Sequence, residues 1–123
     1  MSVSGWGVFL RTVLVADDDP DVLDVLASIL RHADYRVLTA PSGSDAIPIL
    51  DHEPVDLLLT DVEMPGLDGW QLAAQAKTKR PHLRVVFITA GTRYRGRPPF
   101  PVIEKPVRAV KLVEAIKRWM SAA

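Results

Sequence analysis

The chain has 123 residues, of which 48% are hydrophobic and 24% are charged, and its 15 basic side chains balance its 15 acidic ones. This size and composition fit one folded domain rather than a disordered chain, and a net charge of zero gives no reason to expect direct binding to nucleic acid. The absence of cysteine excludes disulfides and suits a cytoplasmic location, and no apolar stretch approaches the ~20 residues of a membrane span.

The first predicted elements are a strand over 13–16 and the helix that follows it. Asp19 and Pro20 open this helix, because Asp is a good N-cap and Pro is tolerated at the first helical position. Apolar side chains then recur at helical spacing and predict the buried face, at Val22, Val25, Leu26, Ile29 and Leu30.

The middle of the chain continues this alternation. A second strand is predicted over 35–39 and a second helix over 42–51, in which Pro48 predicts a kink or a late start. The third apolar run ends at Asp61. After a turn-rich loop, a third helix is predicted over 70–79.

The last third of the chain leaves little room for a crossover helix. The fourth strand ends at Thr89 and the fifth precedes Lys105, so 15 residues must supply a strand and its connections. Three prolines and two glycines in 91–101 oppose a helix, and we predict an extended loop or at most one helical turn there. The final helix is predicted over 107–120, with a core face of Ala109, Leu112, Val113, Ile116 and Trp119 or Met120.

Strict alternation of strands and helices predicts a parallel sheet with helices on both faces. The carboxyl ends of parallel strands lie on one edge of such a sheet, and ligands bind outside that edge. Polar side chains stand at the ends of four of the five predicted strands, at Asp17, Asp18, Asp61, Thr89 and Lys105. We therefore expect three carboxylates, a hydroxyl and an ammonium group to converge on one point.

Carboxylates that converge repel one another, by several kcal/mol a pair at about 4 Å and an effective dielectric of about 20. A hard divalent cation such as Mg²⁺ relieves this repulsion and bridges carboxylates to phosphate. Lysine and threonine side chains suit phosphate oxygens, and an aspartate beside them can be the nucleophile that forms an acyl phosphate. The set of side chains predicts Mg²⁺-assisted phosphoryl chemistry.

Four motifs in a fixed order give the chain a resemblance to a known family. The first is the acidic triplet 17–19, which precedes Pro20 at the end of the apolar run 13–16, and the second is Asp61 before a Met-Pro-Gly loop in 56–69. The third and fourth are the pairs Thr89-Ala90 and Lys105-Pro106. From about residue 12 to residue 120, the chain resembles the receiver domain of two-component response regulators. The resemblance implies a doubly wound, five-stranded parallel sheet of flavodoxin-like order 2-1-3-4-5, here with the fourth helix short or missing. It divides the chain into an N-terminal extension, 1–11, and a receiver domain, 12–123.

The resemblance also implies how the site works. Asp61 would accept a phosphoryl group from a histidine kinase or a histidine phosphotransfer protein, Thr89 would be the switch hydroxyl, and Lys105 would pair with the phosphate. The bond between Lys105 and Pro106 is expected to be cis, as it often is in this family. Such a chain is a switch rather than an enzyme, and it catalyses at most its own phosphorylation and dephosphorylation.

The same resemblance assigns the metal ligands. Mg²⁺ would be held by the carboxylates of Asp17, Asp18 and Asp61 and by the backbone carbonyl of Glu63. Of the acidic pair, Asp18 would be the more direct ligand.

Two features depart from the family pattern. First, Val102 stands where the family carries Tyr or Phe, and Tyr94 and Phe100 are nearby but out of register. Second, the fourth helix, which is part of the usual output face of the family, is expected to be largely missing. With no output domain after the last helix, the chain is expected to act through an unidentified downstream protein or to relay phosphate onward.

Two other classes of function compete with this interpretation. The first is a Mg²⁺-dependent phosphohydrolase, because Asp61-Val62-Glu63 is similar to the Asp-x-Asp motif of the haloacid-dehalogenase-like group. Glu63 stands where that group has a second Asp, however, and no cap domain is present to enclose a substrate. The second is a flavodoxin-like nucleotide binder, which is disfavoured because no Gly-rich or Ser/Thr-rich loop follows the first strand.

Overall fold

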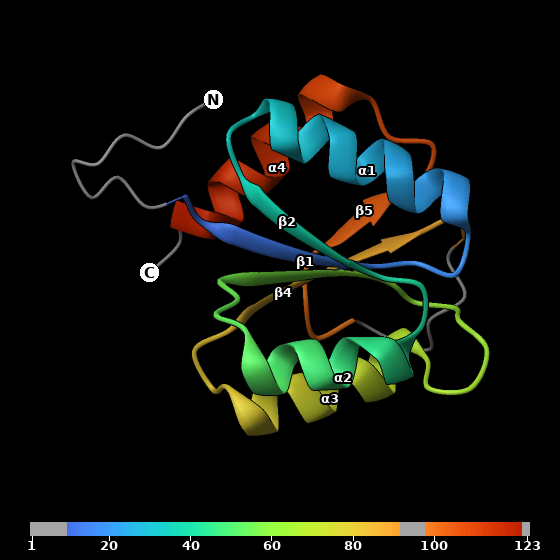
Figure 1. Ribbon diagram of the computed structural model, residues 1–123. Coiled ribbons are helices and arrows are strands. Elements are labelled where there is room, and N and C mark those ends of the chain that lie inside the picture. Colours follow the sequence, from blue (N-terminus) through green and yellow to red (C-terminus); the bar gives the residue numbers. More distant parts are fainter. Residues whose placement is uncertain (1–9, 92–97, 122–123) are drawn as a thin grey trace.

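A computed structural model of the chain describes residues 10–91 and 98–121. In these residues, one sheet of five parallel strands in the order β2-β1-β3-β4-β5 lies between two layers of helices, with α1 and α4 on one face and α2 and α3 on the other (Figure 1). The elements in chain order are β1 (Thr12–Ala16), α1 (Pro20–His32), β2 (Arg36–Ala40), α2 (Gly43–His52), β3 (Leu57–Asp61), α3 (Gly69–Lys79), β4 (Arg84–Thr89), β5 (Val102–Glu104) and α4 (Ala109–Ser121). The fold class and strand order agree with the prediction.

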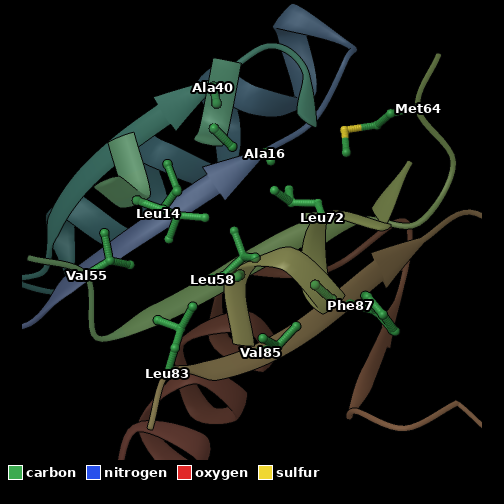
Figure 2. Close-up of a cluster of buried hydrophobic side chains, with 14 of the residues drawn as sticks. Leu14, Ala16, Ala40, Val55, Leu58, Met64, Leu72, Leu83, Val85 and Phe87 are labelled. Carbon is green, nitrogen blue, oxygen red and sulfur yellow. The ribbon is translucent and has the colours of Figure 1, made fainter. Parts of the chain in front are cut away.

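The strands are apolar on both sides because both faces of the sheet are covered. Successive side chains of a strand point to opposite faces, so Leu14, Leu58 and Phe87 pack toward α2 and α3 while their neighbours pack toward α1 and α4. Figure 2 shows the first of these clusters, in which side chains of β1, β3 and β4 meet Leu72 of α3 and Met64 of the loop after β3.

Helix α1 begins as predicted, and four of the five apolar residues expected on its inner face are buried or partly buried against the core. Asp19 is its N-cap and accepts hydrogen bonds from the backbone N–H groups of Asp21 and Val22. Val25, expected in the core, is 57% exposed. The buried residues are Leu23, Leu26, Ala27 and Leu30. Leu23 and Val25 both lie at helical spacing from other apolar residues, so periodicity alone could not choose between them.

Helix α2 corrects the expectation of a late start. It begins at Gly43, directly after its N-cap Ser42, and Pro48 lies inside it. Proline at this position removes the N–H group that would pair with the carbonyl of Ser44. Ser44 and Pro48 are both exposed, so water can hydrate that carbonyl and the helix tolerates the proline.

Helix α4 begins two residues later than predicted. Its buried side chains are Leu112, Ile116 and Met120, while Trp119 packs at the margin of the core. Ala109, which was expected in the core, is exposed. Among the described residues, no helix combines the length and hydrophobicity that crossing a membrane requires.

The connection between β4 and β5 contains no helix in residues 90–91 and 98–101, which agrees with the prediction; Tyr94 and the rest of 92–97 lie outside the described residues. Phe87 of β4 is nevertheless fully buried. The ring of Phe100 meets the Phe87 ring edge to face at a centroid distance of 5.7 Å. To its other neighbour, the Trp70 ring of α3, the Phe87 ring has a centroid distance of 5.3 Å. This aromatic row, Trp70, Phe87 and Phe100, covers part of the sheet that a crossover helix would cover.

Replacing Phe87 and Phe100 by Leu, singly and together, tests the aromatic row. We expect a coupling of about 0.5–1.5 kcal/mol in the free energy of unfolding, because edge-to-face rings contribute that much beyond their buried area. Urea denaturation of the four proteins measures it. As a control, Phe100→Leu combined with Ile116→Val, on the opposite face of the sheet, should be additive within about 0.5 kcal/mol. If the effects of Phe87→Leu and Phe100→Leu on the free energy of unfolding are additive within the same limit, the two rings do not stabilise each other beyond their buried area.

Candidate functional site

The predicted site residues come together because the strands are paired in register at their carboxyl ends. Asp61 is the last residue of β3 and Thr89 is the last of β4, while Asp17 directly follows β1 and Lys105 directly follows β5. The pairings Asp61 with Ile88 and Thr89 with Glu104 set β3, β4 and β5 level at this edge. Four residues far apart in sequence therefore meet at one point of the surface.

Lys105 is the centre of the site. Its Nζ donates to Asp17 Oδ2 at 2.8 Å and to Asp61 Oδ2 at 3.2 Å. The side chain of Asp17 is fully buried, and those of Asp61 and Lys105 are 10% and 17% exposed. The remaining carboxylate oxygens are also bonded, since Asp17 Oδ1 accepts from the Asp19 N–H at 2.9 Å and Asp61 Oδ1 accepts from the Glu63 N–H at 3.3 Å.

The acidic residues form a group that matches the ligand preference of a hard cation. One carboxylate oxygen from each of Asp17, Asp18 and Asp61 lies within 4.8 Å of the others. Asp18 is exposed, so the group opens to solvent on that side. Three carboxylates face one ammonium group here, and oxygen donors of this kind are the ligands that Mg²⁺ prefers.

The electrostatic balance of the site shows in two pKa shifts. Burial raises the pKa of Asp61, the charge of Asp17 adds to the rise, and Lys105 opposes it without cancelling it. Burial on its own would lower the pKa of Lys105, but its hydrogen bonds and charge interactions with Asp17 and Asp61 outweigh burial and raise that pKa. Lys105 is therefore firmly held as a cation, whereas the charged form of Asp61 is less favoured than that of a free carboxylate.

A cavity of about 360 Å³ opens beside Asp61. It is lined by Asp61, Glu63, Thr89, Ala90, Gly91 and Lys105. Thr89 is 2% exposed, and its Oγ1 accepts a hydrogen bond from the Gly91 N–H at 3.3 Å. The cavity has room for a phosphoryl group and has a carboxylate, a hydroxyl and an ammonium group on its walls. The Lys105–Pro106 peptide bond is cis, as expected.

Sequence reasoning gave no role to two residues that hold the backbone of Asp61. The buried hydroxyl of Thr60 donates to the Asp61 carbonyl at 2.9 Å. Gly69 donates its N–H to the Val62 carbonyl, and a Cβ placed on Gly69 would lie 2.2 Å from the Asp61 carbonyl oxygen. Gly69 belongs to the loop motif that ends at residue 69, which was the signal available for it in the sequence.

Comparison with known proteins gives a consistent result. The family described as "Response regulator receiver domain" matches residues 13–117. The response regulator receiver protein CpdR of Brucella abortus is 34% identical over 120 residues, which cover 93% of this chain and 100% of that protein. The transcriptional regulatory protein GlrR of Escherichia coli is also 34% identical, over 85% of this chain, but the match spans only 25% of GlrR.

Solved structures agree with the sequence matches. A response regulator receiver protein from Sinorhizobium medicae is 29% identical with a TM-score of 0.83, over 92% of this chain and 96% of that one. The receiver domain of the hybrid histidine kinase CckA is 30% identical with a TM-score of 0.80, over 89% of this chain and 99% of that one. None of these matches supports the phosphohydrolase alternative. The chain therefore belongs to the receiver domains of two-component response regulators, which are phosphorylation-activated signalling domains.

Proposed function

We propose that Asp61 is the phosphoacceptor of this receiver and that Mg²⁺, held by Asp17, Asp18, Asp61 and the backbone carbonyl of Glu63, assists the transfer. The observation that carries the proposal is the contact of Lys105 Nζ with both Asp17 and Asp61, beside a third carboxylate. Mg²⁺ would supply positive charge for the phosphoryl oxygens and relieve the repulsion among the carboxylates.

The positions of the side chains support the following transfer. An oxygen of Asp61 attacks phosphorus and forms the new O–P bond, while the P–N bond to the donor histidine breaks and its electron pair leaves with the imidazole nitrogen. Lys105, already 3.2 Å from Asp61, neutralises charge on the transferred group. The Thr89 hydroxyl can then donate its proton to a phosphoryl oxygen, which favours the conformation in which Thr89 contacts the phosphate.

The partners follow from this chemistry. The donor would be a histidine kinase or a histidine phosphotransfer protein in the cytoplasm, and the downstream partner would be a protein. Val102 is half-buried against the α2–α3 side of the core and has no ring to move with Thr89. Output would therefore not use the coupled movement of the Thr89 hydroxyl with an aromatic residue of β5 that is usual in the family. We assign residues 12–123 to the receiver unit and 1–11 to an extension.

Asp61→Asn should abolish acid-labile phosphate incorporation, because the amide is a poor nucleophile. The measurement is incubation with acetyl phosphate and Mg²⁺, followed by intact-mass analysis before and after acid treatment. Asp24→Asn, an exposed change on α1, is the matched control and should be labelled like the wild type. Full labelling of Asp61→Asn would refute the assignment, and repeated turnover of a small phosphate ester by the wild type would favour the phosphohydrolase.

Asp18→Ala should weaken Mg²⁺ binding at least about tenfold, or about 1.4 kcal/mol, because it removes the exposed ligand of the acidic group. The measurement is a Mg²⁺ titration followed by amide chemical shifts near Asp61. Asp21→Ala, an exposed change in the first turn of α1, should leave the titration unchanged. Equal midpoints for Asp18→Ala and the wild type would contradict the ligand role.

Metal-free Asp61→Asn should melt at a higher temperature than the metal-free wild type. Like charges within 4.8 Å repel by about 3 kcal/mol at an effective dielectric of about 20, and Lys105 offsets part of this. Adding Mg²⁺ should stabilise the wild type and act much less on the variant, because ligands stabilise the state that binds them. Calorimetry with and without Mg²⁺ measures both effects, and a metal-free variant less stable than the wild type would count against the repulsion.

A further inference from the structure

We propose that Gly43, the first residue of α2, is a positioning residue for the loop that carries Glu63, and through that loop for the metal and phosphoryl site. The inference rests on the proposed function of Asp61. Helix α2 contributes none of the side chains that line the site, so nothing assigned so far connects it with the chemistry.

Gly43 lies where a side chain does not fit. It is buried, and a Cβ placed on it would lie 2.4 Å from the carbonyl oxygen of Leu67 and 3.0 Å from the Leu67 Cβ. Leu67 belongs to the loop between β3 and α3. Cβ contacts below 3.0 Å essentially never occur, so any larger residue at 43 requires a shift of at least about 0.6 Å (3.0 − 2.4). The nearest atom is backbone, so no rotamer change can relieve the contact.

The loop is the partner that has room to move. Helix α2 is fixed in the core by Ala46 and Leu50, which are 0% and 1% exposed and pack with strands of the sheet. Pro65 and Gly66, in the middle of the loop, are exposed. A larger residue at 43 should therefore displace the loop rather than the helix.

A displacement at Leu67 is passed on because hydrogen bonds tie both ends of the loop to the residues around Asp61. Gly69 donates its N–H to the Val62 carbonyl at 2.9 Å, and Met64 is 6% exposed within the core. Glu63 donates its N–H to Asp61 Oδ1 at 3.3 Å. The residue that would offer its carbonyl to the metal therefore lies between anchored neighbours, four positions before the contact with Gly43.

The size of the displacement decides whether it matters. Functional groups must be held within about 0.5 Å of their working geometry, and a misplacement of about 1 Å can cost about 100-fold in rate. A shift of at least about 0.6 Å at Leu67 exceeds the first limit. Alanine is also the better helix former, so helix propensity alone would not make Gly43→Ala harmful.

Gly43→Ala should raise the Mg²⁺ concentration at half-saturation about tenfold and slow phosphorylation by acetyl phosphate at limiting Mg²⁺, with part of the rate restored at saturating Mg²⁺. The metal midpoint is measured by amide chemical shifts of the loop, separately from activity. Ser44→Ala, an exposed change one residue along the same helix, is the matched control and should behave like the wild type. Gly69→Ala, which crowds the Asp61 carbonyl directly, should show the larger loss.

A folded Gly43→Ala whose Mg²⁺ midpoint and phosphorylation rate lie within twofold of the wild type would overturn the proposal, even if its thermal stability is lower. If the variant unfolds at 25 °C, the titration is repeated on all four proteins in trimethylamine N-oxide, which favours the compact state. A wild type that is not labelled on Asp61 would instead refute the proposed function.

Discussion

The contact of one ammonium group with two carboxylates is the constraint on which this structure depends. Lys105 reaches Asp17 across 88 positions and Asp61 across 44, so both bonds exist only when β1, β3 and β5 end at the same edge. Removing Lys105 from this buried set would leave its carboxylates without a compensating charge, which is costly. The fold and the site are therefore maintained together, because a change that shifts a strand out of register also separates these charges.

Much of the site could be predicted from the sequence because it follows from topology. Once alternating strands and helices indicate a parallel sheet, residues such as Asp61 and Thr89 must lie at its carboxyl edge. The exposure of Val25 in α1 could not be predicted, because Val25 and Leu23 both lie at helical spacing from other apolar residues. Gly43 gave no local signal either, since its restriction comes from a carbonyl group 24 positions away that only the folded chain brings close.

The loop after Asp61 connects the helix layer formed by α2 and α3 with the chemistry of the site. Its residues contact α2 through Gly43 and adjoin α3 at Gly69, and they pack into the core through Met64. The loop is short and exposed at its middle, yet the glycines on either side let backbone approach backbone. The position of the Glu63 carbonyl is thus set by packing rather than by the sequence of the loop alone.

The aromatic row has a consequence for recognising related chains. Three rings, from α3, β4 and the residues before β5, pack together on the face of the sheet that α2 and α3 cover, and the connection from β4 to β5 (90–101) is barely longer than an average helix of about eleven residues. A shorter connection also lowers the entropic cost of closing the chain between β4 and β5. Other receivers with such abbreviated connections should be identifiable by an aromatic residue two positions ahead of the fifth strand, matched by aromatic residues in the fourth strand and the third helix. A search for that combination would separate an architectural subgroup that the phosphorylation motifs, being common to the whole family, do not distinguish.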